Sequence, residues 1–211
     1  MDIVATQRQV SLEEKAQISR QVKAELVEHL YKGCLPGTIG GIPVGIAIFI
    51  VLFQHTPTPY LIAWTIYYSL SLINLTLLYF FRLKNPTKFT ESQWLFAYSI
   101  AMCLCAVSWG LCGGFLMPDT MARQYIMFIA LLMFGTGYAT GSIGVFELCV
   151  ATLSIIVIPL ITWCFLQGGF LYNLIGAFSI IYIVFLISIN RRSTQWFKDS
   201  LKLKLENTLG S

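Results

Sequence analysis

The chain has 211 residues, of which 56% are hydrophobic and only 11% charged, with a mean hydropathy of +0.71. Soluble domains carry about 25% charged residues, so this balance argues against a soluble fold and predicts an all-α polytopic membrane protein. The net charge of +4 does not indicate nucleic-acid binding, because the basic residues lie in loops and tails, where they orient membrane proteins.

The first 33 residues are polar, and they lack the apolar core and cleavage site of a signal peptide. Ser11 and Glu14 fit a capping box, with Ser11 as the N-cap of a helix. The apolar residues that share one side of this helix are Leu12, Ala16, Val22, Leu26, Val27 and Leu30. Glu28 and Lys32 form a favourable i, i+4 pair. Residues 1–33 are therefore expected to form an amphipathic cytoplasmic helix that ends at Gly33. This helix lies on the membrane surface or packs against the C-terminal helix of its own or a partner chain.

Six apolar windows follow, each close to the ~20 residues that cross a bilayer. Their approximate bounds are 35–53, 60–81, 93–116, 122–143, 148–167 and 170–190. The fourth and fifth windows are separated mainly by Glu147, the only charged residue between Arg123 and Arg191. A charge at that position favours a loop. We therefore predict that residues 34–190 form a six-transmembrane-helix bundle.

The Lys and Arg residues predict the orientation of this bundle. All but one of the fourteen fall on one side of a six-span arrangement, in the N-terminal tail, the loop after the second span and the C-terminal tail. Arg123 is the exception. The positive-inside rule then places both termini in the cytoplasm. A five-span arrangement would break this partition, which favours six spans.

No Asp, Glu, Lys, Arg or His lies deep inside a predicted span. Intramembrane ionisable residues usually mark ion pathways, proton relays and catalytic sites, so the pattern argues against a pump, a proton-coupled transporter or an intramembrane protease. His29 and His55 flank opposite sides of the predicted bilayer and cannot jointly bind a haem or a metal. We expect no catalytic residues, no metal site and no cofactor. The six cysteines lie in or beside apolar runs and are expected to be buried small hydrophobic residues.

Aromatic residues of the third span supply the first ligand-pocket candidates. Trp109 is too deep for an interfacial belt, and with Ser108 it is expected to line a cavity open to the outer leaflet or the periplasm. The other candidates, at similar or shallower depth, are Trp64, Tyr67, Trp163, Tyr172 and Asn173. An interfacial belt is the alternative role of Trp64, Trp163 and Tyr172. Asn74 is expected to donate a hydrogen bond between helices.

The fourth span contains a small-residue face. Gly137, Gly141 and Gly144 recur at i, i+4 and i+7, and such faces let helix backbones approach closely in lipid. The face is interpreted either as an intramolecular packing seam or as a seam that slides when a signal binds.

The C-terminal segment, residues 191–211, combines two local signals. Alternation over Leu201–Leu205 suggests a strand, but no Gly or Pro interrupts the chain between Asn190 and Leu209. We therefore expect the sixth span to continue as a helix. One stripe of this helix is Phe197, Leu201, Leu205 and Thr208, and the other is Trp196 and Leu203. Two stripes suit a helix that packs against more than one neighbour.

Several of these features resemble one bacterial module. They are the segment Val27–Tyr31 before the first span, the six spans, the small-residue-rich fourth span, and the tail Asp199–Leu209. Together they resemble the six-span sensory domains related to the MASE group, which precede GGDEF, EAL or histidine-kinase output domains.

The resemblance implies a sensory input domain in the bacterial inner membrane, belonging to cyclic di-GMP or two-component signalling. It also implies a homodimer and a small hydrophobic ligand as the candidate partner. Signal transmission would run along Arg191, Arg192, Trp196, Phe197, Leu201 and Leu205. The tail is expected to lead into an output domain beyond Leu209, with Gly210 and Ser211 as a cloning remnant.

Three alternatives remain open from the sequence. A small stand-alone transporter or channel needs a polar pathway, and the deep spans offer only Ser, Thr, Asn and Cys. A membrane enzyme needs carboxylates or a His-based nucleophile pair, and the spans carry no such set. A scaffold or assembly protein is the third.

Overall fold

The computed structural model describes residues 2–53 and 55–209, and it describes the burial of side chains 17–53 and 55–205. Every regular element in these residues is a helix, which confirms the all-α fold. The helices are α1 (Asp2–Lys32), α2 (Cys34–Leu52), α3 (Thr58–Lys84), α4 (Glu91–Gly114), α5 (Met121–Gly141), α6 (Phe146–Gln167) and α7 (Phe170–Leu209).

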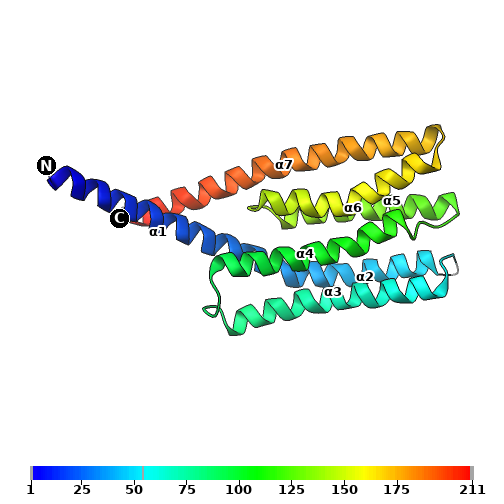
Figure 1. The fold of residues 1–211 in the computed structure, drawn as a ribbon, viewed down its shortest axis with the longest axis horizontal. Helices are drawn as coiled ribbons and strands as arrows, with labels where there is room; N and C mark the ends of the chain where they lie inside the picture. The colour runs from blue at the N-terminus through cyan, green and yellow to red at the C-terminus, as the bar shows by residue number, and fades with distance from the viewer. Residues whose placement is uncertain (1, 54, 210–211) are drawn as a thin grey trace.

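The helices form an elongated bundle with two distinct ends (Figure 1). At one end, which we call the proximal end, α1 and the C-terminal part of α7 project beyond the other helices. The α3–α4 and α5–α6 loops also lie at the proximal end. The α2–α3, α4–α5 and α6–α7 loops lie at the opposite, distal end. The segments that carry all but one of the Lys and Arg residues therefore share the proximal end.

Local sequence explains most helix boundaries. Thr90 and Gln93 form a reciprocal capping box at the start of α4, which satisfies two N-terminal N–H groups. Gly168 and Gly169 have φ angles of +69° and +81° between α6 and α7, a backbone region that glycine enters without steric cost. The helix end predicted at Gly33 is only a one-residue interruption between α1 and α2, because Gly33 keeps helical angles (φ −75°, ψ −16°) and Gln17–Leu52 continues as one helical segment.

The N-terminal boundary of α1 differs from the prediction. The helix begins at Asp2, so Ser11 lies inside it and is not its N-cap. Residues 2–32 contain neither Gly nor Pro. The residues before Ser11 therefore include no helix breaker, and the helix extends through them to Asp2. The side chains of Ser11, Glu14, Leu12 and Ala16 lie outside those that the structure describes.

Five helical segments of the described chain are long and apolar enough to cross a membrane. They are Gln17–Leu52, Thr58–Lys84, Glu91–Gly114, Phe146–Gln167 and Phe170–Leu205. The structure thus shows five of the six predicted spans by this criterion. The sixth, α5, has 21 residues, but it includes Arg123 and Gln124 in its first turn.

Helix α5 nevertheless runs from one end of the bundle to the other. At the distal end, Arg123 Nη1 donates hydrogen bonds to the carbonyl oxygens of Val51 (2.9 Å) and Phe53 (3.3 Å), where α2 ends. At the proximal end, Gly144 follows α5 and lies against Leu26 of α1. A helix of this length rises about 30 Å, which matches the thickness of a bilayer core.

Two glycines of α4 lie at a close contact with α6. A Cβ atom at Gly110 would overlap the carbonyl oxygen of Ile155 in α6, and one at Gly114 would lie 2.9 Å from Cβ of Pro159. Small residues at these positions therefore let α4 and α6 approach closely. The packing seam expected in the fourth span lies in the third span instead.

Helix α1 packs on its own chain, along both α4 and α7. Leu26, Val27 and Leu30 are buried, as their shared helical face predicts, while Glu28 and Lys32 are exposed. The predicted i, i+4 pair is present, with Lys32 Nζ 2.8 Å from Glu28 Oε1. Five of the six cysteines are buried, and Cys103 is half-buried.

Candidate functional site

The described structure has a cavity of about 560 Å³, whose lining includes His29 and Lys32 at the proximal end of the bundle. Its walls come from the end of α1 and from α2, α3, α4 and α5. Ligand pockets commonly occupy about 300–1,000 Å³, so the volume suits a small organic molecule.

Aromatic side chains form the inner wall of this cavity, and they come from three helices. The rings are those of Tyr68, Tyr98, Trp109, Phe134 and Tyr138. Trp109 stacks on Phe134 with ring centroids 3.7 Å apart, and the Tyr68 ring meets Trp109 edge-on at 5.0 Å. These contacts hold the wall rigid through aromatic packing.

The Tyr98 hydroxyl is an unused polar group in this wall. Tyr98 is only 2% exposed, and the described structure gives its hydroxyl no hydrogen-bond partner. By contrast, the Tyr68 hydroxyl donates to the carbonyl oxygen of Gly41 at 2.7 Å. The Tyr98 hydroxyl is not among the fully buried unpaired atoms of the described residues, so it keeps access to the cavity that Tyr98 lines and is available to a ligand there.

Glycines form the sides of the cavity opening, between α2 and α5. Gly37 and Gly40 of α2 and Gly137 and Gly141 of α5 are exposed and line the cavity. A Cβ atom built at any of the four would meet nothing within 4 Å. At these four positions no side chain narrows the opening between α2 and α5.

The charged rim of the cavity belongs to α1. His29 and Lys32 line the proximal mouth, and none of the described residues lining the cavity is an Asp or Glu. The His29 ring also contacts α7, where its centroid lies 4.8 Å from that of Phe197. One side chain thus contacts both the cavity and the long C-terminal helix.

A junction of three segments surrounds this contact. Gly144, in the α5–α6 loop, has a φ of +103° and donates its N–H to Thr194 Oγ1 of α7 at 3.0 Å. One turn earlier in α7, Asn190 Nδ2 donates to the carbonyl oxygen of Ala139 at 2.6 Å. Leu26 of α1 packs on Gly144. Helices α1, α5 and α7 therefore meet beside the cavity mouth.

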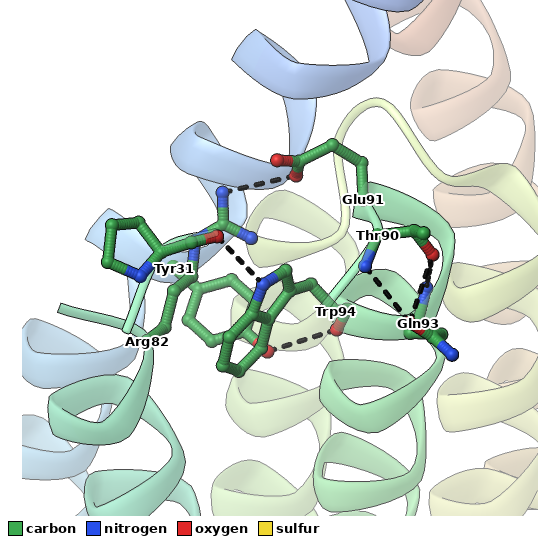
Figure 2. A network of polar contacts seen from close by, with 7 residues as sticks. Tyr31, Arg82, Thr90, Glu91, Gln93 and Trp94 are labelled. Carbon is green, nitrogen blue, oxygen red and sulfur yellow. Dashed lines mark hydrogen bonds and ion pairs between the residues drawn. The ribbon is translucent and has the colours of Figure 1, made fainter. Parts of the chain in front are cut away.

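A second polar network fixes α1 to the α3–α4 hairpin (Figure 2). Arg82 Nη2 lies 3.2 Å from Glu91 Oε2, and the Arg82 guanidinium carbon lies 4.6 Å from the ring centroid of Tyr31. The Tyr31 hydroxyl donates to the carbonyl oxygen of Trp94 at 3.0 Å, and Trp94 Nε1 donates to that of Pro86 at 3.2 Å. The hairpin and α1 are thus one rigid unit, and the junction with α7 is on the other side of α1.

The structure places the two third-span candidates differently. Trp109 lines the cavity, as predicted. Ser108 is fully buried, and its hydroxyl donates to the carbonyl oxygen of Cys105 at 2.6 Å, so it does not reach the cavity. The cavity opens toward the end that carries both termini, not the end expected for Trp109. The packed rings of Trp64, Tyr68 and Trp109 close its distal side.

The second-span candidates support the wall from behind. Trp64 is 3% exposed, which rules out a place in a lipid-facing belt, and its indole N–H donates to the carbonyl oxygen of Ser108 at 2.9 Å. The Tyr67 hydroxyl donates to the carbonyl oxygen of Leu104 at 2.9 Å. Asn74 is exposed and makes no hydrogen bond among the described residues, so the interhelical bond expected there is wrong.

Trp163, Tyr172 and Asn173 lie in a separate distal cluster. The Trp163 and Tyr172 rings meet edge-on at 5.6 Å, and the Tyr172 hydroxyl donates to Gln124 Oε1 at 2.8 Å. Asn173 is exposed at the start of α7. None of the three lines the cavity, so the predicted pocket set divides between two places.

The predicted small-residue face is also divided. Gly137 and Gly141 border the cavity opening and pack against nothing, whereas Gly144 lies beyond the end of α5 and is not on its face. The reason is that α5 ends at Gly141, which a spacing of i+7 does not reveal. The three residues therefore do not form one packing seam within this chain, and a sliding role stays a prediction.

The α7 residues assigned to transmission fall on two faces. Phe197, Leu201 and Leu205 are half-buried, whereas Trp196 is 70% exposed. Arg191 and Arg192 are exposed. The stripe with Phe197 therefore includes the contact with α1, and the stripe with Trp196 and Leu203 is mostly exposed.

Sequence reasoning missed His29, Tyr98 and Tyr138 as cavity residues. Aromatic residues are common in apolar spans, and His29 is an unexceptional histidine in a polar segment. The signal that could have found the opening was Gly37–Gly45, a glycine-rich run in the first span. Comparison of the chain with protein-family models, curated proteins and solved structures found no match.

Proposed function

We propose that this chain is the membrane-embedded sensory input domain of a bacterial signal-transduction protein. Six spans, including α5, cross the inner membrane with both termini in the cytoplasm. The chain acts as a homodimer and controls a GGDEF/EAL or histidine-kinase output domain connected to α7. The output class and the dimer come from the resemblance of the tail and the entry helix to such modules.

The contact between His29 and Phe197 is the observation that supports this proposal most directly. A ligand in the cavity changes the surroundings of His29, and His29 lies against the helix that leaves the membrane. A ligand shifts a two-state equilibrium only if it binds the two states differently. If α7 moves relative to α1, the rim at His29 changes, and the two states then bind a ligand with different affinities.

The charge distribution and the shape of the cavity also support it. The basic segments at the proximal end agree with a cytoplasmic location of that end under the positive-inside rule. The described cavity lining includes no residue of α6, α7 or the distal loops, which suits binding better than passage through the membrane. The exposed stripe with Trp196 and Leu203 is available to a second copy.

The phase of α7 provides the test. We fuse the chain at Leu209 to a diguanylate cyclase domain and insert one alanine between Gln195 and Trp196, which rotates everything downstream by about 100°. An insertion of seven residues, close to two helical turns, is the matched control because it restores the phase. We expect the single insertion to change cyclic di-GMP output and the seven-residue insertion to preserve it. Equal output from both would contradict transmission along the helix.

A further inference from the structure

The gap between α2 and α5 opens sideways at the level of the bilayer. Gly37 and Gly40 lie in the first two turns of α2, and Gly137 and Gly141 lie in the last two turns of α5. Both helices start or end at the proximal end (Figure 1). The gap is in the first turns of α2 and the last turns of α5. In the proposed six-span arrangement, these turns are next to the lipid head groups and upper acyl chains of one leaflet.

The cavity behind the gap changes in polarity with depth. His29 and Lys32 lie at the mouth, and the inner wall is formed by Leu72, Met102, Trp109 and Phe134. About 10 Å of helix rise separates Cys34 from Gly41 along α2. A molecule that fits this gradient has a polar head at the mouth and an apolar chain inside.

The sign of the head group follows from the rim. Lys32 and His29 are the basic side chains of the described lining, and the lining includes no Asp or Glu. Glu28 does pair with Lys32, but the side chains are 60% and 73% exposed, and exposed pairs contribute little. An anionic head group can therefore share the ammonium group of Lys32.

The Tyr98 hydroxyl points to the same occupant. Its ring packs against Tyr31, with centroids 5.4 Å apart, which places it near the last turn of α1. The hydroxyl makes no hydrogen bond among the described residues, and it is not one of their fully buried unpaired atoms, so it keeps access to the cavity that Tyr98 lines. An oxygen of a bound head group would satisfy it.

We propose that the cavity binds a single-chain anionic amphiphile, which enters from the proximal leaflet through the glycine gap between α2 and α5. The head group lies at His29, Lys32 and Tyr98, and the acyl chain lies against Trp109 and Phe134. This inference deepens the proposed function and rests on it for the role of the ligand as a signal.

The test uses the full chain in lipid nanodiscs, with a palmitic acid analogue that carries a diazirine near the end of its chain. After irradiation, mass spectrometry locates the labelled peptides. We expect adducts within Met102–Trp109 and Phe134–Tyr138, suppressed by unlabelled palmitate. Labelling confined to lipid-facing positions, such as Ile62, Ile66 and Ile129, would overturn the proposal.

Two variants test the route of entry. Gly137→Leu and Gly40→Leu place side chains in the gap from opposite sides, and neither Cβ meets a neighbour, so the fold is retained. Ala63→Leu, at an exposed position of α3, is the matched control. We expect both gap variants to reduce cavity labelling about tenfold and the control to label as wild type does. Unchanged labelling in both gap variants would overturn the route.

Competition identifies the head group. Hexadecanol has the same chain without a charge, and lysophosphatidic acid carries a phosphate in place of the carboxylate. We expect hexadecanol to compete about tenfold more weakly than palmitate, and equal competition would overturn the anionic assignment. A stronger competitor of the two anions identifies a free acid or a lipid phosphate as the ligand. Because no output domain is used, a failure here is separate from a failure of the α7 phase test.

Discussion

Gly144 and Gly137 show how differently two glycines of one motif can behave. Gly144 has a φ of +103°, and an added Cβ would lie 3.0 Å from Leu26 Cδ1. Gly137 is helical and has open space around its Cβ position. A residue other than glycine in a left-handed conformation lowers the stability of the folded state by about 1–3 kcal/mol. A Gly→Ala substitution within a helix raises that stability by up to about 1 kcal/mol.

We therefore expect Gly144→Ala to lower the melting temperature of the protein in detergent and to loosen the junction of α1, α5 and α7. Gly137→Ala is the matched control and should melt at the wild-type temperature or above it. Both are measured by thermal denaturation followed by circular dichroism. If the two variants melted alike, the left-handed backbone at Gly144 would be of no consequence for stability.

Arg82 combines an ion pair and a ring contact in one half-buried side chain. It pairs with Glu91 and lies over Tyr31, and its Nη1 is buried without a hydrogen-bond partner in the described structure. A planar guanidinium can make both contacts, whereas a lysine ammonium is a point charge that does not stack.

We expect Arg82→Lys to destabilise the attachment of α1 by about 1–2 kcal/mol, although it keeps the positive charge. Lys84→Arg, at an exposed position two residues later, is the control and should have no effect. Proteolysis at the basic residues of α1 measures the attachment. Equal cleavage of the Arg82→Lys and wild-type proteins would show that the planar guanidinium of Arg82 is not needed to attach α1.

At the scale of elements, α7 is attached to the bundle at two points near the cavity mouth. Asn190 donates to the Ala139 carbonyl oxygen, and Thr194 accepts from Gly144. Polar contacts between transmembrane helices contribute on average about 0.6 kcal/mol each and at most about 1.7. Such contacts are strong enough to position α7 and weak enough to change when a ligand binds.

Asn190→Leu removes the first of these contacts while retaining size. We expect faster amide hydrogen exchange across residues 190–205, because α7 separates from α5 more often. Ser188→Ala is the control, since the Ser188 hydroxyl donates only to Val184 within α7. Identical exchange in the Asn190→Leu and wild-type proteins would mean that the Asn190 contact does not hold α7 against α5.

At the scale of the whole molecule, the alternation of loops between the two ends predicts a defined topology. Asp119 lies in the distal α4–α5 loop and Glu147 follows the proximal α5–α6 loop, and both are exposed. If α5 crosses the membrane, these residues are on opposite sides. Single cysteines at the two positions should therefore react with a membrane-impermeant maleimide in vesicles of opposite orientation.

The native cysteines provide little background in that experiment because five of the six are buried. Lys88→Cys, in the α3–α4 loop, should label together with Glu147→Cys. Labelling of Asp119→Cys and Glu147→Cys from the same side would leave α5 outside the membrane and would remove the six-span topology.

The sequence by itself determined the helices. Apolar windows, turn residues and the capping residues of α4 are local, so the boundaries of α2 to α6 agree with the prediction within a few residues. Asn190 to Leu209 is helical because nothing in that stretch ends a helix. The depth of Trp109 was sufficient to predict that it lines a cavity.

Only the tertiary structure decided where that cavity opens and what it touches. Gly137 and Gly141 could have packed against a neighbouring helix, and whether a glycine face is closed or open depends on the partner across from it. His29 gained its position between the cavity and Phe197 from the crossing of α1 and α7. Helix formation depends on neighbours in the chain, but a cavity is the space left when helices distant in sequence fail to fill it.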